Sequence, residues 1–461
     1  MRFHQVMNEE LGCASYLLAD SGEAIVVDPR WDVDVYLELA SNAGARIVHV
    51  VETHDHADHV SGRGRLVRRT GAQAHQPHHA GEPGSPGLRC GDEVRAGRIC
   101  MRAIATPGHR PEHLSLLVSD GERDVDGWCL LAGDSLLVGD VARPDLAVAA
   151  QDGARDLHAS VQRILALGDH VELWPAHVGG SLCGGRLSAK TSSTIGFERR
   201  AQPATELCQE DFVSAVAGRT PPRPPNVARI VALNQGPLDA EPAEPAILDA
   251  AGVRDAVARG ATVLDVRPVA EFDSLHLQGA LALGTGANRA TRAGWAVDPE
   301  EPLLVIGRDV ADAQQFAAAL HAVGLWSVEG VAAGDGAAWR AVGCPVATAA
   351  AWSVDALARA LGAGRLRLID VREHDEYEAG HVPGSVSVPL HELRDGRGCV
   401  SVEDGPLAVA CATGPRAAFA ASLLRRAGHR DVVRVAGGGV RDLAALGVRL
   451  ATADASLRLA A

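Results

Sequence analysis

The first part of the chain alternates between short apolar runs and polar turns. Apolar residues fill 14–20 and 23–29, and the intervening Ser-Gly pair is typical of a β-hairpin. Residues 32–45 then predict a helix, and residues 46–53 predict a buried strand. This strand ends at a cluster of histidines and aspartates, in the kind of loop where α/β scaffolds commonly hold open sites.

Two proline-rich stretches interrupt this pattern. Residues 217–226 read AGRTPPRPPN and residues 236–245 read GPLDAEPAEP, and both indicate linkers or segments that wrap around the fold. The chain up to about residue 240 is therefore expected to form one domain.

An internal repeat follows the second stretch. Residues 262–280 are similar to residues 367–385, and the segment that begins at Pro302 is similar to the one that begins at Pro406. Each copy spans about 100 residues, which is the size of a whole domain and not of a solenoid repeat. The sequence thus predicts an α/β multidomain chain with boundaries 1–240, 246–348 and 351–450.

Composition narrows the class of protein. With 461 residues, 47% of them hydrophobic, the chain is long enough for roughly three soluble domains. The net charge of −14 argues against a nucleic-acid partner. The nine cysteines are an odd, scattered set, which suits free thiols in a reducing compartment. Because no apolar run reaches membrane-spanning length and the start is no signal peptide, we expect a cytoplasmic protein without a membrane partner.

The densest chemistry lies in VETHDHADHV, residues 51–60, which holds three histidines and two aspartates. Such a cluster predicts a metal site. Further candidate ligands follow in short motifs: a Pro-Gly-His at His109, a Gly-Asp at Asp134 and a Pro-Ala-His at His177.

The order of these motifs resembles that of the metallo-β-lactamase fold over about residues 1–240. The resemblance implies an αββα sandwich with the site at the edge of two sheets. In its two-metal hydrolases, seven such residues hold two ions that activate a water. One ion would bind His54, His56 and His109, and the other would bind Asp58, His59 and His177, with Asp134 between them.

A second branch on this fold, the persulfide dioxygenases, uses a single Fe(II). The resemblance implies His54, His109 and Asp134 as its ligands, a facial triad with open positions for substrate and O₂. His56, Asp58, His59 and His177 would then orient the ligands and bound water. The segments around Asp134 and His177 resemble this branch, particularly its bacterial forms fused to rhodanese domains. We therefore expect one Fe(II) per chain, and a zinc thioesterase of the glyoxalase II type is the alternative.

Several residues near these motifs are either packing residues or contacts for an anionic substrate. Arg110, His113 and Arg143 flank the ligands, and Arg110 replaces the threonine usual in the resembled family. Lys190 is the only lysine in the chain and is a candidate contact for a thiol carrier. Cys183 is either a small buried thiol or a sulfur-handling residue.

The last copy of the repeat carries a candidate nucleophile. A buried strand leads to a six-residue loop from Cys411 to Arg416, followed by a helix. Backbone N–H groups and the helix N-terminus would favour the Cys411 thiolate. The surrounding segments resemble a rhodanese domain, which implies that Cys411 carries sulfane sulfur and that Arg416 supports it. The middle copy has Gly307 at the cysteine position, and Val310 replaces Gly414, so we expect it to be inactive.

Together these features predict an enzyme that oxidises a small persulfide, carried by glutathione, coenzyme A or a similar thiol. O₂ would be the oxidant and sulfite the product, and Cys411 would interconvert persulfide, sulfite and thiosulfate. We also expect a homo-oligomer.

Overall fold

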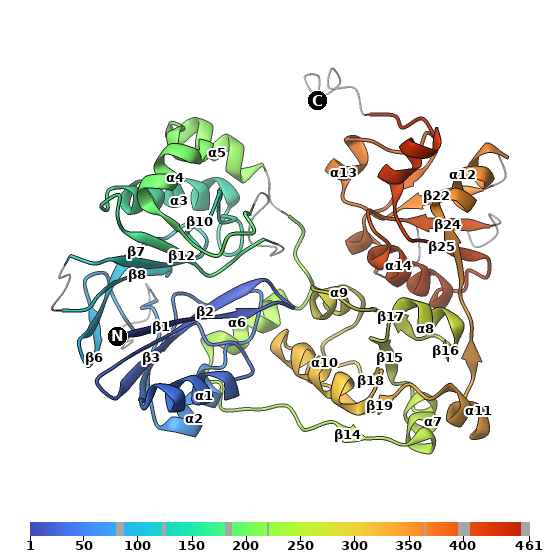
Figure 1. Cartoon of the computed structure of the whole chain (residues 1–461), viewed down its shortest axis with the longest axis horizontal. Coiled ribbons are helices and arrows are strands. Elements are labelled where there is room, and N and C mark those ends of the chain that lie inside the picture. Colours follow the sequence, from blue (N-terminus) through green and yellow to red (C-terminus); the bar gives the residue numbers. More distant parts are fainter. Residues whose placement is uncertain are drawn as a thin grey trace. The chain divides into compact units, whose positions relative to one another are not determined.

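The computed structural model describes residues 1–79, 87–121, 126–179, 187–218, 221–363, 366–394 and 406–452 (Figure 1). The chain divides into two compact units. The first comprises Met1–Arg223, Val227–Glu241 and His321–Gly324, and the second comprises Pro224–Asn226, Pro242–Leu320 and Leu325–Ala461. No helix in the described ranges is both long and apolar enough to span a bilayer.

The first unit contains two large sheets. One has the order β1-β2-β3-β4-β5, and the other has the order β13-β12-β9-β8-β7-β6. The strands of the first sheet are β1 (Arg2–Asn8), β2 (Cys13–Asp20), β3 (Glu23–Val27), β4 (Arg46–Val51) and β5 (Gln73–His75). Those of the second are β6 (Glu93–Ala96), β7 (Ile99–Ala105), β8 (Leu114–Ser119), β9 (Cys129–Gly133), β12 (Glu172–Pro175) and β13 (Ser193–Thr194). A short pair, β10 (Leu136–Leu137) and β11 (Asp140–Val141), forms a separate two-stranded sheet.

Helices cover the outer faces of both sheets. Figure 1 shows α1 and α2 on one side of the unit and α3, α4 and α5 on the other. The helices of the unit are α1 (Asp34–Ala43), α2 (Arg63–Thr70), α3 (Ala150–Leu165), α4 (Ile195–Ala201), α5 (Gln209–Ala217) and α6 (Val227–Gln235), with a 3₁₀ turn at η1 (Pro203–Glu206).

Alternation along the strands explains this layering. In β2, Tyr16 and Leu18 face the second sheet, whereas Leu17 packs with the α1 residue Tyr36. In the second sheet, Leu131 faces the first sheet and Leu130 packs under α3. Successive side chains of one strand thus pack alternately between the two sheets and between a sheet and its helices. The predicted αββα sandwich is confirmed.

The predicted hairpin is also confirmed. β2 and β3 pair antiparallel, with Asp20 opposite Glu23. Ser21 and Gly22 both have positive φ, 52° and 84°, as a type I′ turn requires. The predicted helix and the strand that leads to the histidine cluster are present as α1 and β4.

The second unit contains two parallel five-stranded sheets of equivalent topology. Their orders are β14-β19-β18-β15-β17 and β21-β25-β24-β22-β23. The first has β14 (Ala246–Ile247), β15 (Thr262–Asp265), β17 (Leu281–Ala282), β18 (Leu303–Gly307) and β19 (Val328–Ala333). The second has β21 (Ala350–Ser353), β22 (Arg367–Asp370), β23 (Val386–Ser387), β24 (Leu407–Ala410) and β25 (Val432–Ala436). A small ladder joins β16 (His276–Leu277) to β20 (Val346–Ala347).

The helices of this unit follow the same repeat. The first copy has α7 (Ala250–Ala258), α8 (Val269–Ser274), α9 (Arg289–Ala296), α10 (Val310–Ala322) and α11 (Gly336–Ala341). The second has α12 (Val354–Gly362), α13 (His374–Glu378) and α14 (Pro415–Arg426), with 3₁₀ turns η2 (Leu390–Glu392) and η3 (Val440–Leu446).

The two copies also share a buried ion pair. Arg267 pairs with Asp265 in the first copy, and Arg372 pairs with Asp370 in the second, each with a shortest N–O distance of 2.6 Å. This agreement in side-chain chemistry, together with the sheet order, confirms the internal repeat. Both copies lie within one compact unit, so the boundaries 246–348 and 351–450 remain a prediction.

Candidate functional site

The predicted metal ligands meet because each follows the end of a strand. His54 comes after β4, His109 after β7, Asp134 after β9 and His177 after β12. The parallel pairing of β9 with β12 places the last two beside each other. All four side chains are buried. The chain therefore gathers histidine nitrogens and a carboxylate in a site with little access to bulk water.

Three of these residues form a tight group. His54, His109 and Asp134 each offer one ligand atom, and the three atoms lie within 4.8 Å of one another. Nε2 of His109 lies 3.3 Å from Asp134 Oδ2, and Nε2 of His54 lies 4.0 Å from it. His54 Nε2 and both Asp134 carboxylate oxygens are buried without a hydrogen bond. Buried polar atoms of this kind normally have partners, so the group fits a metal ion.

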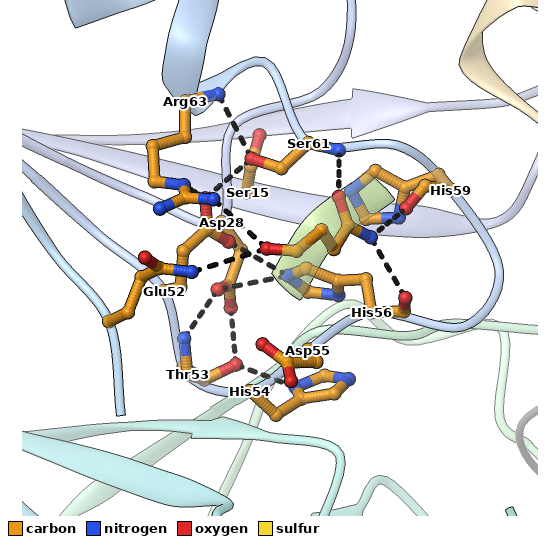
Figure 2. A network of polar contacts seen from close by, with 12 residues as sticks. Ser15, Asp28, Glu52, Thr53, His54, Asp55, His56, His59, Ser61 and Arg63 are labelled. Atoms are coloured by element: carbon orange, nitrogen blue, oxygen red, sulfur yellow. Dashed lines mark hydrogen bonds and ion pairs between the residues drawn. The ribbon is translucent and has the colours of Figure 1, made fainter. Parts of the chain in front are cut away.

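Hydrogen bonds set which His54 nitrogen is free (Figure 2). The Thr53 hydroxyl donates to Asp28 Oδ2 at 2.8 Å, so its oxygen accepts from His54 Nδ1 at 2.9 Å. Asp28 also accepts the Thr53 backbone N–H at 2.7 Å. Because Nδ1 carries the proton, the Nε2 lone pair faces Asp134.

A hydrogen bond at Nδ1 also orients the ring of His109. Its Nδ1–H donates to the Arg143 carbonyl oxygen at 2.9 Å, which leaves Nε2 as the lone pair toward Asp134. Burial is the largest influence on both imidazoles and lowers the pKa of His54 and of His109. Burial would raise the pKa of Asp134, but His177 and His109 outweigh it and hold that pKa low. Neutral imidazoles and an ionised carboxylate are the forms that bind metal.

His56 belongs to a different group. Its Nε2 lies 3.1 Å from Asp28 Oδ1 and 3.2 Å from Glu52 Oε2 (Figure 2). Its Nδ1 lies 3.9 Å from Asp58 Oδ1. Burial alone would lower the pKa of His56, but Asp28 and Glu52 outweigh it and raise that pKa. Glu52 also accepts a hydrogen bond from the Ser61 hydroxyl at 2.5 Å. The carboxylates of Asp28 and Glu52 therefore hold the Nε2 side of the His56 ring, and its Nδ1 side faces Asp58.

Asp58 is the centre of the remaining candidates. Its Oδ1 accepts from His59 Nδ1 at 3.1 Å, and its Oδ2 lies 3.5 Å from His177 Nε2. The same His177 nitrogen lies 3.2 Å from Asp134 Oδ2. The four predicted residues outside the triad thus form a chain of contacts, and His177 links this chain to the carboxylate of Asp134.

The structure adds Cys13, which the sequence analysis missed. Its thiol donates to Asp58 Oδ2 at 2.9 Å, and Cys13, Asp58 and His177 form a second group of possible ligand atoms within 4.8 Å. Burial first, and then Asp58, raise the pKa of the Cys13 thiol well above its usual value. No local motif marks this residue, because the contact depends on the start of β2 meeting the end of β12.

His113 proves to be engaged within the protein. Its Nε2 accepts the Asp134 backbone N–H at 2.8 Å, and its Nδ1 lies 2.8 Å from the Thr106 hydroxyl oxygen. Burial lowers the pKa of His113 to about 4. A Cβ at Gly133 would lie 2.5 Å from His113 Nε2, so glycine permits this approach. Both ring nitrogens are used, and the substrate contact predicted for His113 has no free nitrogen to make it.

The other predicted substrate contacts have varied surroundings. Arg110 is buried and donates to Glu112 at 2.9 Å, and Arg143 is buried and donates to Asp145 at 2.7 Å and to the Pro221 carbonyl oxygen. Lys190 is exposed, with its ammonium 5.9 Å from the centre of the Phe197 ring. Residue Cys183 lies in 180–186, outside the described residues.

The second unit presents Cys411 at the end of β24. The thiol is 1% exposed, and the backbone N–H of Gly414 donates to its sulfur at 3.0 Å. Gly414 has φ 113°, which turns the loop directly before α14. Arg416, predicted to support Cys411, forms two hydrogen bonds with the carboxylate of Glu376, at 2.6 and 3.0 Å. The loop around the sulfur is therefore present as predicted, with part of the arginine charge balanced by Glu376.

The matching loop in the middle copy is filled by its own carboxylates. Asp312 Oδ2 accepts the Arg308 backbone N–H at 3.0 Å, and Asp309 Oδ1 accepts the Asp312 N–H at 2.8 Å. A Cβ on Gly307 would lie 2.5 Å from the backbone nitrogen of Ala313. This loop has no nucleophile and no space for one at the position of Gly307.

Comparison with known proteins identifies two domains in the chain. Residues 8–177 match the metallo-beta-lactamase superfamily, and residues 353–445 match the rhodanese-like domain. A metallo-beta-lactamase from Staphylococcus aureus has a similar structure, with a TM-score of 0.66, 26% identity and coverage of 72% of this chain and 99% of that one. The chain thus combines a metallo-β-lactamase domain with a rhodanese-like domain.

The relatives specify the family. The mitochondrial persulfide dioxygenase ETHE1 of Homo sapiens is 30% identical over 234 residues, which cover 50% of this chain and 85% of that protein. The mouse protein is 30% identical over 244 residues with the same coverage. The hydroxyacylglutathione hydrolase of Pseudomonas entomophila is 27% identical over 200 residues, 43% of this chain and 70% of that one. This chain belongs to the persulfide dioxygenase family.

Proposed function

We propose that this protein oxidises a low-molecular-weight persulfide with O₂ at a single Fe(II) held by His54, His109 and Asp134. One persulfide, one O₂ and one water would give one thiol, one sulfite and two protons, and the outer sulfur would supply the four electrons that reduce O₂. The observation that carries this proposal is the buried convergence of two Nε2 lone pairs and an unpaired carboxylate. When bound, Fe(II) would supply adjacent open positions for the persulfide sulfur and for O₂.

The protein contributes orientation. Thr53 and the Arg143 carbonyl each hold an Nδ1–H, so neither imidazole can rotate its lone pair away from Asp134. His113 holds the backbone of Asp134. Burial of all three ligands limits competing water, and fixed reactant geometry lowers the barrier.

A two-metal thioesterase of the glyoxalase II type is the second candidate. It is favoured by the presence of all seven residues that such an enzyme uses, and by the similarity to hydroxyacylglutathione hydrolases. The geometry supports it less well, because no group of possible ligand atoms among the described residues unites Asp58, His59 and His177.

For the second unit, we propose that Cys411 carries sulfane sulfur between persulfide, sulfite and thiosulfate. The rhodanese match and the N–H donated to its sulfur support this role. Residues 351–450 would be the active domain, and residues 246–348 an inactive rhodanese-like domain supported by the equivalent sheet order. All seven cysteines of the described ranges are free, which suits a reducing compartment such as the cytoplasm. The carrier would be glutathione, coenzyme A or a similar thiol.

The decisive experiment combines metal analysis with product analysis. The protein would be purified without oxygen, its iron and zinc measured, and O₂, sulfite and thiosulfate followed with a panel of persulfides. Asp134→Ala should abolish O₂ uptake and keep sulfur transfer at Cys411, whereas Cys411→Ser should do the reverse. Two zinc ions per chain, with thioester hydrolysis and no O₂ uptake, would refute the proposal.

A further inference from the structure

Cys13 contacts Asp58, one of the residues that would hold a second ion in the two-metal arrangement. A second ion would require lone pairs from Asp58, His59 and His177 to converge on one point. Instead, the Asp58 carboxylate accepts hydrogen bonds on both oxygens, from His59 Nδ1 at 3.1 Å and from the Cys13 thiol at 2.9 Å. His177 Nε2 lies 3.5 Å from Asp58 Oδ2, the oxygen that the thiol contacts, and 3.2 Å from Asp134 Oδ2.

The possible ligand groups support this description. Within the described residues, Asp58 is grouped either with His56 and His59 or with Cys13 and His177, and no group unites Asp58, His59 and His177. The Cys13 thiol thus contacts one oxygen of the Asp58 carboxylate, and the His59 ring contacts the other. Both oxygens therefore already have a hydrogen-bond partner.

The backbone keeps the thiol in place. Cys13 forms an isolated antiparallel bridge with His177. On either side, Ala14 N–H donates to the Ala176 carbonyl at 2.6 Å, and Val178 N–H donates to the Gly12 carbonyl at 3.1 Å. Because these bonds join β2 to the segment after β12, the buried Cys13 side chain has little freedom to leave Asp58.

We infer that Cys13 is the positioning residue that keeps the metal centre mononuclear, by occupying the Asp58 oxygen that a second ion would need. The inference rests on the proposed single-iron function and names the residue that separates it from the hydrolase arrangement. Without the thiol, one carboxylate and two imidazoles would remain, a donor set that suits Zn²⁺. Serine would keep a donor toward Asp58, whereas alanine would not.

The test measures metal stoichiometry in the full chain. Metal-free parent, Cys13→Ala, Cys13→Ser and the double variant Cys13→Ala/Asp58→Asn would be loaded with excess Zn²⁺, freed of unbound ion and assayed by mass spectrometry. We expect about one ion in the parent and in Cys13→Ser, close to two in Cys13→Ala, and a return to one in the double variant. The double variant corrects for zinc held elsewhere, and near-ultraviolet circular dichroism checks that each variant is folded.

Other outcomes separate this inference from the proposed function. A single ion in Cys13→Ala, while the parent consumes O₂ with persulfide, would overturn the inference alone. Two ions in the parent, with a Co²⁺–thiolate absorption that disappears in Cys13→Ala, would also overturn it and make Cys13 a ligand. Thioester hydrolysis without O₂ uptake by the parent would instead refute the proposed function.

Discussion

Thr53 offers a direct test of how the chain orients His54. Its hydroxyl donates to Asp28 and accepts from His54 Nδ1, and the side chain is fully buried. Thr53→Val keeps the shape but removes both hydrogen bonds, whereas Thr53→Ser keeps the hydroxyl. In the valine variant, the buried His54 Nδ1–H would lose its acceptor, which costs about 1–3 kcal/mol. The ring would then favour the other tautomer, whose Nε2–H blocks the metal.

The expected effect is a loss of iron affinity of about 10–100-fold, the usual range when a ligand's supporting hydrogen bond is removed. This range corresponds to about 1.4–2.8 kcal/mol, consistent with one unsatisfied buried donor. Anaerobic titration of metal-free protein with Fe(II) against a competing chelator would measure it. The serine variant should stay within a few-fold of the parent. Equal affinity of the valine and serine variants would refute the orienting role of Thr53.

Three further predictions concern the second unit. Gly307→Cys should not create sulfur transfer in the middle copy, because the added Cβ would lie 2.5 Å from the backbone at the start of α10. The assay uses a chain in which Cys411 is replaced by serine. Thiosulfate turnover by this chain would contradict the prediction. Asp370→Ala should destabilise the last copy by about 3–5 kcal/mol, because it leaves the buried Arg372 guanidinium without its carboxylate. Urea unfolding would measure this loss, with Asp370→Asn as the milder control. Glu376→Gln should lower the KM for thiosulfate by up to about fivefold, because glutamine no longer offsets the positive charge of Arg416. This magnitude is the one expected for a partly exposed ion pair. An unchanged KM would mean that Arg416 does not face the anion.

Much of this protein could be predicted from local sequence. The hairpin after β2 follows from a Ser-Gly turn between two apolar runs, and the internal repeat follows from recurring motifs. The ligand types were also evident, since histidines and aspartates directly after buried strands collect at a sheet edge. These features depend on neighbours along the chain, whose spacing is visible in the sequence.

Tertiary structure decided how those side chains are used. The sequence shows that His54 and His56 are two residues apart, but only the packing of β3 beside β4 places Asp28 where it orients both. Likewise, Cys13 reaches Asp58 from 45 positions away, and Arg416 meets Glu376 across 40. A residue's type determines which lone pairs and protons it has. The direction in which they point depends on hydrogen bonds from distant segments, and these exist only once the sheets have packed.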